Sequence, residues 1–397
     1  MVNSDPRSGT NPIFGGNKLK LGLFGFNGPG VAFTTVPELF EPTWANSDEI
    51  GRMADSLGIE ALVPYSRWKA FNRHDHGQSL ETSSWAAAVS ARTNRACVMT
   101  TTHVPAYAPV ISAKTAATTD QISGGRFGIN IVCGWFKAEI EMFGTLQQSH
   151  DDRYAVADEW ITLQKRLWTA DEPIDFEGKY YTVKQALIEP KPVQHGGPAI
   201  MNAGISPRGQ HFSARHSDIA FTQILDPSPD SIKAKVAAYK QLAHREYGRS
   251  IQVWVHSYVV QRDTLQEARA YVDYYVLQKG DQGMADLFLA NNIGKFDHLP
   301  PEVLARLRYS MMAGSGGFPI LGNADEITNT LHMLSRCGVD GVLLTWVDFK
   351  QGLELFRDTV LPRLEQCSLR SPPAQAEART CGDSLSAQAV AMAGRKC

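Results

Sequence analysis

The segment Ile122–Trp135, which reads ISGGRFGINIVCGW, decides the fold class of this chain of 397 residues. It passes from the end of a helix through two glycines into an apolar strand, and it ends in Gly134 and Trp135. Gly124 and Gly125 suit a helix end, where the backbone needs a positive φ that a side chain opposes. In a parallel α/β protein, ligands bind at the carboxyl ends of the strands. The segment therefore predicts such a fold, with a binding site beside Gly134 and Trp135.

A single polar residue, Asn130, interrupts this apolar strand. A buried amide is costly unless its donors and its acceptor find partners. Two interpretations stay open on position alone: backbone groups hold the Asn130 side chain, or the side chain points at a ligand.

Apolar segments that read as strands alternate along the chain with amphipathic segments that read as helices. The predicted strands are 20–26, 61–65, 96–101, 127–133, 199–203, 219–222, 253–260 and 342–347. The helices between them include 48–57, 79–90, 108–122, 153–168, 229–244 and 264–277. Eight strands with intervening helices predict an α/β fold, the (β/α)8 TIM barrel with insertions. A doubly wound open sheet is the alternative.

We expect one barrel domain over residues 1–369. Within it, 175–183 reads as a small hairpin before the fifth strand, and about 283–319 reads as a lid insertion. The lid prediction rests on the small residues of 313–319, which permit large changes of φ and ψ; a plain surface loop is the alternative. Residues 370–397 are rich in Ala, Ser, Pro and Gln, a composition that predicts a disordered tail.

The composition excludes several classes of function. The chain is 43% hydrophobic and 20% charged, with a formal net charge of -2, and its Lys and Arg residues form no basic stripe for nucleic acid. No apolar run approaches the ~20 residues that span a membrane, and the first residues show no signal peptide pattern. The six cysteines have neither CxxC nor metal-ligand spacing, which favours reduced thiols and a cytoplasmic location.

The turn 202–209, which reads NAGISPRG, is a candidate phosphate site. An apolar strand ends at Gly204, Ser206 stands at a helix N-cap position, and Pro207 takes the first helical position. Free backbone N–H groups and the helix dipole favour an anion there, and Arg208 could add positive charge. An ordinary capped helix is the alternative.

The glycine-rich segment 22–30 invites comparison with nucleotide-binding loops. Neither a helix start nor a phosphate-binding lysine follows it, as those motifs require. We therefore interpret it as a loop at the barrel mouth.

Other polar residues follow the strands at the same end of the barrel. His103 directly follows the third strand, so we expect it to face the barrel mouth. Glu139, Arg153 and Tyr154 come after the fourth strand and either line that mouth or lie on the surface. The two histidines within 74–76 have no third ligand in view, so no metal site is predicted.

Taken together, these motifs resemble the bacterial-luciferase-like flavin-dependent monooxygenases, and most closely the branch of pyrimidine oxygenases and dialkylsulfone monooxygenases. The likeness extends to about residue 365. It rests on the order and spacing of several motifs, which are 122–135, Glu139, Arg153 with Tyr154, Ala203 and Gly204 with Ser206, 212–215, 341–345 and 348–349.

The resemblance implies a barrel that binds reduced FMN, delivered by a separate NAD(P)H:flavin reductase, and that uses O2 as co-substrate. It implies oxygen insertion into a small organic substrate, such as a heterocycle, a sulfone or a related xenobiotic, with bond cleavage. A homodimer or homotetramer is expected. Two alternatives stay open: hydride transfer with the deazaflavin F420, and flavin binding without catalysis.

The resemblance also assigns roles to particular residues. Those expected to bind the cofactor are Ser66, Arg67, Asn130, Glu139, Arg153, Tyr154, Gly204 and Ser206, with Tyr154 and Ser206 at its phosphate. Those expected in catalysis are Asn130, His103 and Val104. Val104 stands where pyrimidine oxygenases carry a threonine, so an oxygen-binding hydroxyl is either missing or replaced by the His103 imidazole. Four aromatic residues are expected to build a dry wall or to be plain core: Tyr65, Trp68, Trp135 and Trp346.

Overall fold

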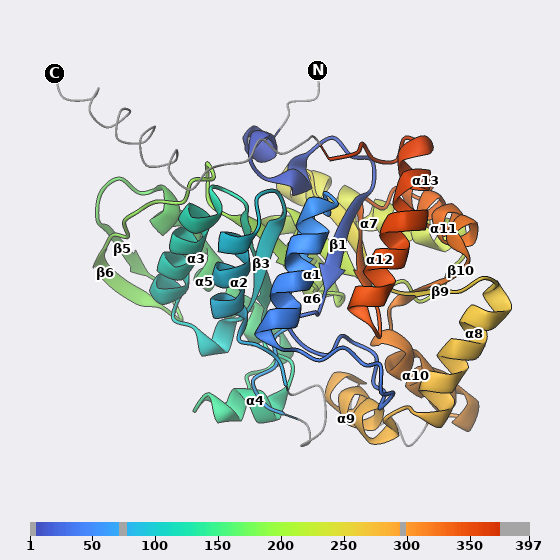
Figure 1. The fold of residues 1–397 in the computed structure, drawn as a ribbon. Helices are drawn as coiled ribbons and strands as arrows, with labels where there is room; N and C mark the ends of the chain where they lie inside the picture. The colour runs from blue at the N-terminus through green and yellow to red at the C-terminus, as the bar shows by residue number, and fades with distance from the viewer. Residues whose placement is uncertain (1–4, 71–77, 294–298, 374–397) are drawn as a thin grey trace.

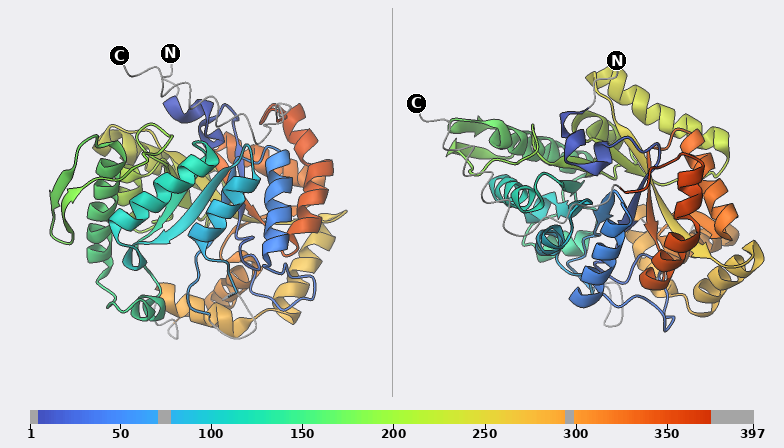
Figure 2. Two further views of the ribbon diagram at one scale, coloured as in Figure 1. Left: turned by 60° about the vertical axis from the view of Figure 1, so that its left-hand side comes forward. Right: turned by 45° about the horizontal axis from the view of Figure 1, so that its top comes forward.

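The computed structural model describes residues 5–70, 78–293 and 299–373, in which parallel strands close into a barrel surrounded by helices (Figure 1, Figure 2). The barrel strands are β1 (Lys20–Phe24), β2 (Ala61–Val63), β3 (Cys97–His103), β4 (Phe127–Val132), β7 (Ala199–Asn202), β8 (Ile219–Thr222), β9 (Gln252–Gln261) and β11 (Gly341–Thr345). β1 pairs with both β2 and β11, and β9 pairs with both β8 and β11, so the sheet closes on itself. The predicted (β/α)8 barrel is confirmed, and the open-sheet alternative is wrong.

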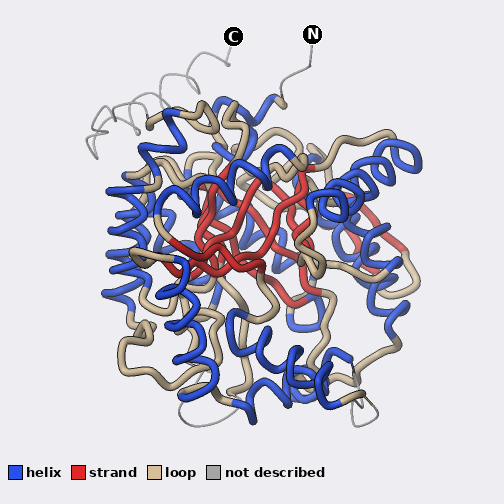
Figure 3. The backbone as a smooth tube through the Cα atoms, turned by 90° about the vertical axis from the view of Figure 1, so that its right-hand side faces the viewer, coloured by secondary structure: helices blue, strands red, loops and turns tan. Residues whose placement is uncertain are grey.

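Helices connect successive barrel strands and lie around them, as the tube in Figure 3 shows. They are α1 (Trp44–Ser56), α2 (Thr82–Arg92), α3 (Pro109–Ser123), α5 (His150–Thr169), α6 (Pro207–His216), α7 (Pro229–Tyr247), α11 (Ala324–Arg336) and α12 (Phe349–Thr359), with α13 (Leu361–Gln366) last. Gly124 ends α3 in the left-handed conformation with φ 68°, as its sequence position predicts. Ser206 caps α6 and Pro207 opens it, again as predicted.

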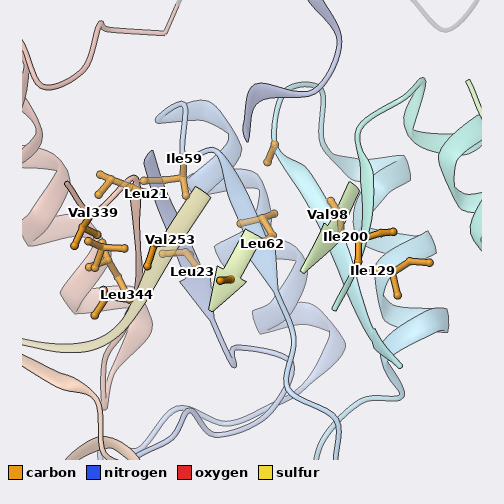
Figure 4. Packing of buried hydrophobic residues seen from close by; sticks show 14 of the residues in the cluster. Leu21, Leu23, Ile59, Leu62, Val98, Ile129, Ile200, Val253, Val339 and Leu344 are labelled. Carbon is orange, nitrogen blue, oxygen red and sulfur yellow. The ribbon is translucent and has the colours of Figure 1, made fainter. Parts of the chain in front are cut away.

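Most barrel strands are buried on both faces, which explains why they read as continuous apolar runs. Residues such as Val63, Met99 and Leu343 fill the barrel interior. Their neighbours in sequence point outward into a second layer of core beneath the helices, which Figure 4 shows around Leu62 and Leu344. The strands therefore alternate between two apolar environments rather than between core and water.

The insertions differ in part from their prediction. The hairpin expected at 175–183 is confirmed as the antiparallel pair β5 (Ile174–Glu177) and β6 (Thr182–Ala186). Between β9 and β11 the chain forms α8 (Leu265–Asp273), the π-helical turn η4 (Tyr274–Gln278), α9 (Gln282–Ile293) and α10 (Pro301–Gly314). The segment 283–319 is therefore mostly helical, and its glycine-rich run ends α10 and leads into a further strand.

That strand, β10 (Phe318–Gly322), was missed by the sequence prediction. It pairs in parallel with β9 outside the closed barrel. Pro319 stands within it, and a proline argues against a strand unless the strand lies at a sheet edge, as β10 does. Only the tertiary arrangement shows that this edge position is available.

Three helices outside the ring around the barrel gather at one end of the molecule. Figure 1 shows α4 (Lys137–Met142), α9 and α10 together at its lower end. In the described part of the chain no helix combines the length and the apolar character needed to cross a bilayer. The predicted start of the disordered tail at residue 370 is wrong, because Arg370 is 5% exposed and donates to the carbonyl of Gly58. The rest of that tail, from 374 onward, and the histidine pair of 74–76 lie outside the described residues.

Candidate active site

The residues expected in the site come from four neighbouring strands and the segments that follow them. Ser66 and Arg67 follow β2, His103 ends β3, and Val104 begins the short turn η3 (Val104–Ala106). Asn130 lies in β4, and Glu139, Arg153 and Tyr154 lie in α4 and α5. Gly204 and Ser206 form the turn between β7 and α6. Since β2, β3, β4 and β7 are adjacent in the barrel, the structure brings these residues to one sector of its carboxyl end.

Asn130 is 4% exposed and holds a fixed orientation. Its Nδ2 donates to Oγ1 of Thr101 at 3.1 Å, and the Thr101 hydroxyl donates in turn to the carbonyl of Pro64. Because that hydroxyl has used its proton, it accepts from Asn130, so the amide nitrogen must face it. Oδ1 of Asn130 is then left as a buried acceptor without a hydrogen-bond partner among the described residues. The barrel therefore fixes the amide nitrogen of Asn130, and the amide oxygen can accept a hydrogen bond from a ligand.

Glu139 is fully buried and ties three segments together. Its Oε1 accepts from the backbone N–H groups of Trp68 at 2.5 Å and Lys69 at 3.1 Å. Its Oε2 lies 3.2 Å from Nδ1 of His103, although neither of these two atoms completes a hydrogen bond of good geometry. Burial by itself raises the pKa of Glu139, but His103 and the two N–H groups outweigh burial and hold the pKa below its ordinary value. The carboxylate is therefore charged and fixes the loop after β2.

Replacing Glu139 by glutamine is expected to lower the free energy of unfolding near neutral pH by about 1–3 kcal/mol, because buried hydrogen bonds to a charge are lost. A carboxyl whose pKa is lowered in the folded state stabilises that state above its unfolded pKa, and this contribution disappears as pH falls through the folded value. The difference in urea midpoint between wild type and Glu139→Gln should therefore shrink as pH falls below 4.5.

Glu141→Gln is the matched control for this experiment, because Glu141 lies on the same helix, is half exposed and pairs only loosely with Lys137 at 3.7 Å. Its free energy of unfolding should stay within about 0.5 kcal/mol of wild type at every pH. A midpoint difference for Glu139→Gln that does not change with pH would contradict the assignment of a charged, stabilising carboxylate.

Arg67 lies in a cage of aromatic rings. Its guanidinium carbon is 5.2 Å from the ring centre of Trp135, 5.7 Å from Tyr65 and 5.9 Å from Phe288. Burial lowers the pKa of Arg67, while the charge of Glu139 opposes this. Phe288 belongs to α9, and the centre of its ring lies 4.9 Å from the ring centre of Trp135. α9 therefore covers this side of the mouth.

At the other end of the site, Ser206 and α5 face each other. Oγ of Ser206 accepts from the N–H of Gly209 at 3.1 Å and lies 3.0 Å from Nε2 of His150, the first residue of α5. The ring of His150 lies 5.2 Å from that of Tyr154. Gly204 is packed closely here, because a Cβ on it would come within 2.7 Å of Cα of Gly209. Hydroxyl, phenol and imidazole groups thus converge at the start of α6.

His150 was not among the residues predicted for the site. It stands 56 positions before Ser206, and its only local signal is its place at the start of a helix. The structure brings the two together because α5 and α6 pack side by side in the ring of helices.

The two arginines near this turn are bonded elsewhere. Arg208 forms an ion pair with Asp158, which also contacts Nε2 of His216 at 2.9 Å, so the charge suggested for the turn is neutralised between α5 and α6. Arg153 donates to the carbonyl of Gly134. The expectation that Arg208 adds positive charge to the turn is therefore wrong. Arg153 anchors the end of β4, and its role in binding the cofactor stays a prediction.

A cavity of about 280 Å³ lies beside this sector and has residues from both ends of the site in its wall. Val104, which is 2% exposed, contributes from the η3 side, and Arg153 contributes from α5. The other lining residues come from the β3–α3 loop, the end of β4, α4 and the loop after it, α5 and the hairpin: Pro105, Ala106, Tyr107, Ala108, Cys133, Ile140, Thr145, Leu146, Gln147, Gln148, Val156 and Tyr181.

The four aromatic candidates separate in the structure. Tyr65 packs on the loop after β1, where a Cβ on Gly28 would come within 1.9 Å of its hydroxyl, and this places the glycine-rich loop at the mouth as predicted. Trp135 belongs to the Arg67 cage, and Trp68 is 38% exposed. Trp346 is buried against Gly352 and is plain core. Among the described residues no group of acidic, histidine or cysteine side chains is arranged to hold a metal ion.

A parallel (β/α)8 barrel with polar groups gathered at its carboxyl end is the architecture of a class of enzymes that bind small molecules there. Residues 20–341 match the model of the luciferase-like monooxygenase family, and the chain belongs to that family. The chain is therefore a flavin-dependent monooxygenase, as the resemblance of its motifs implied.

Among curated relatives, the chain is 29% identical to the FMNH2-dependent dimethylsulfone monooxygenase of Pseudomonas putida, over 80% of this chain and 87% of that protein. It is 30% identical to the pyrimidine monooxygenase RutA of Bradyrhizobium sp., over 87% of this chain and 96% of that protein. The crystal structure of riboflavin lyase RcaE, with modified FMN and riboflavin, superposes with a TM-score of 0.78 at 23% identity, covering 90% and 94% of the two chains.

Proposed function

We propose that this protein is the oxygenase of a two-component, FMNH2-dependent monooxygenase. It takes reduced FMN from a separate NAD(P)H:flavin reductase and inserts one oxygen atom of O2 into a small organic substrate, with bond cleavage. The observation that carries the proposal is the buried, unpartnered Oδ1 of Asn130 at the carboxyl end of β4. The family and the two relatives named above support it.

The residues present fit FMN at both ends. A flavin ring carries N–H donors, and Oδ1 of Asn130 is an acceptor that lacks one. A phosphate needs hydrogen-bond donors and a favourable dipole, which the start of α6, Ser206, Tyr154 and His150 offer. Ser66 and Arg67 would lie along the ring, and Gly204 would let the backbone approach the ligand closely.

Reduced flavin supplies the electrons and activates O2, so no redox side chain is required of the protein. The protein's own task is to orient the ring and to keep water out. Val104 is buried beside His103, and Trp135 and Phe288 close the Arg67 side. Val104 offers no hydroxyl, which leaves Asn130 and His103 as the polar groups that reach this part of the mouth from β4 and β3.

Equilibrium uptake of FMN by the full chain tests the proposal, followed by incorporation of labelled O2 into a panel of heterocycles and sulfones with a reductase and NADH. Saturable FMN uptake and label in a product are expected. Saturable uptake of F420 with no uptake of FMN would contradict the proposal in favour of hydride transfer, and FMN uptake with no labelled product would favour a binding protein. A homodimer or homotetramer and a cytoplasmic location stay predictions.

We further propose that α9 acts as the lid of this site. Phe288→Ala should remove the contact with Trp135 and let water reach the mouth, so the fraction of NADH recovered as H2O2 should rise at least about twofold while FMN affinity stays within about twofold. Leu287→Ala, at the neighbouring and more exposed position, is the control. Equal H2O2 release from wild type and Phe288→Ala would reduce α9 to a surface helix.

A further inference from the structure

His103 faces the interior of the barrel at its mouth. Successive residues of a strand alternate between its two faces. Cys97 and Met99 of β3 belong to the barrel interior, so Thr101 and His103, which continue the same alternation, face inward at successive levels. Thr101 is the residue that holds the amide of Asn130. The imidazole of His103 therefore stands one level nearer the mouth than that amide.

Glu139 fixes which imidazole nitrogen carries the proton. Nδ1 of His103 lies 3.2 Å from Oε2 of Glu139, and both side chains are buried. Although these two atoms do not complete a hydrogen bond of good geometry, a lone pair on Nδ1 would face the charged carboxylate at this separation, so a neutral imidazole favours its proton on Nδ1 and its lone pair on Nε2. Within the described ranges, Glu139 is the one polar partner of the His103 side chain. Nε2 is thus a base that the protein orients and leaves available.

The charges around this base come from two elements. Glu139 approaches from α4, and its carboxylate is held by the N–H groups of Trp68 and Lys69. Arg67, from the loop after β2, interacts electrostatically with Glu139. Among the residues that the structure describes, these two opposite charges balance each other before any ligand binds. A site with this balance favours an uncharged substrate over a sulfonate or a carboxylate, since burying an unmatched charge is costly.

We propose that Nε2 of His103 accepts a proton from the bound substrate, with Glu139 as the positioning residue. The substrate is accordingly an uncharged molecule with an N–H or O–H group made acidic by an adjacent carbonyl. The lone pair of Nε2 forms the new N–H bond, and the electron pair of the broken bond stays on the substrate. Glu139 stabilises the imidazolium without taking the proton, and Arg67 stabilises the substrate anion. This inference rests on the proposed function and narrows its substrate class.

The first test reads the imidazole tautomer by 1H–15N NMR of the full chain labelled at histidine, with FMN bound. In wild type we expect the His103 proton on Nδ1. In Glu139→Gln the amide Nε2 of glutamine becomes a donor toward Nδ1, so the proton should move to Nε2. His103→Asn identifies the signal, and His211→Asn is the control, because His211 bonds Tyr247 on the outer helices. The same tautomer in wild type and Glu139→Gln would overturn the proposal.

The second test uses matched substrate pairs with a reductase, NADH and labelled O2: phthalimide with N-methylphthalimide, and succinimide with N-methylsuccinimide. Label should enter the N–H compounds and not their N-methyl derivatives. His103→Asn should lower the labelling rate about 100-fold or more, as loss of a general base does, with FMN affinity unchanged within about twofold.

Equal labelling within a pair, or no labelling of either N–H compound by an FMN-loaded enzyme, would overturn the proposal while leaving the proposed function intact. If wild type takes up no FMN, the proposed function fails instead, so the two failures are distinguishable.

Discussion

Asn130→Ala is expected to leave the barrel folded and to uncouple flavin oxidation from substrate oxygenation. The variant loses one internal hydrogen bond, to Thr101, and the open acceptor Oδ1. Loss of a buried hydrogen bond to the flavin costs about 1–3 kcal/mol, so the ratio of product to H2O2 should fall about 5- to 150-fold. The measurement is labelled product and H2O2 per NADH consumed, with a reductase supplied.

Asn202→Ala is the matched comparison, because Asn202 is a buried amide on the next strand whose groups are satisfied internally. Its Nδ2 donates to Ile131, and its Oδ1 accepts from Gly204 and Ser213. We expect Asn202→Ala to lose more unfolding free energy than Asn130→Ala, since three hydrogen bonds are lost rather than one. If Asn130→Ala keeps the wild-type ratio of product to H2O2, Asn130 has no part in the reaction.

The second large effect is expected at the phosphate end. Ser206→Ala combined with Tyr154→Phe should weaken FMN binding by about 1–3 kcal/mol, because hydrogen bonds to a charged phosphate are lost. His150→Ala should weaken it as well, since His150 contacts Ser206 and offers a donor from α5. Dissociation constants from flavin fluorescence measure the change.

Riboflavin, which lacks the phosphate, is the internal control for these variants. Its affinity should be the same in wild type, the double variant and His150→Ala, whereas FMN affinity falls. Ser206→Ala also removes the cap of α6, so thermal unfolding must first show that the variant is folded at the assay temperature. Equal weakening of FMN and riboflavin would contradict the phosphate assignment.

Much of the fold could be predicted because its signals are local. Most barrel strands are short and mainly apolar, and Gly124 and Ser206 mark helix boundaries through their own backbone and side-chain chemistry. β10 escaped prediction because Pro319 contradicts a strand except at an edge, and an edge exists only after the barrel has formed. The helices α9 and α10 of the segment predicted as a lid were not foreseen, because the small residues of 313–319 stand out there, although they only end α10 and lead into β10.

The sequence predicted most residues of the site, but it did not predict the hydrogen bonds and ion pairs that these residues form. Asn130 stood out as polar within an apolar strand. The orientation of its amide depends on a hydrogen bond to Thr101, a residue on another strand. Arg208 looked free to meet an anion until α5 placed Asp158 beside it. His150 carried only the signal of its place at the start of a helix, because its contact with Ser206 follows from helix packing across 56 positions.

The amino-acid sequence by itself determined the eight strands, their order and the end of the barrel where polar residues collect, since hydrophobic period and turn chemistry act over a few residues. Only the tertiary structure decided which polar groups are satisfied and which stay open. The acceptor of Asn130, the partner of His103 and the counter-charge of Arg208 all lie far away in the chain. Hydrogen bonds and ion pairs depend on separations of about 3 Å, and packing alone sets those separations between distant segments.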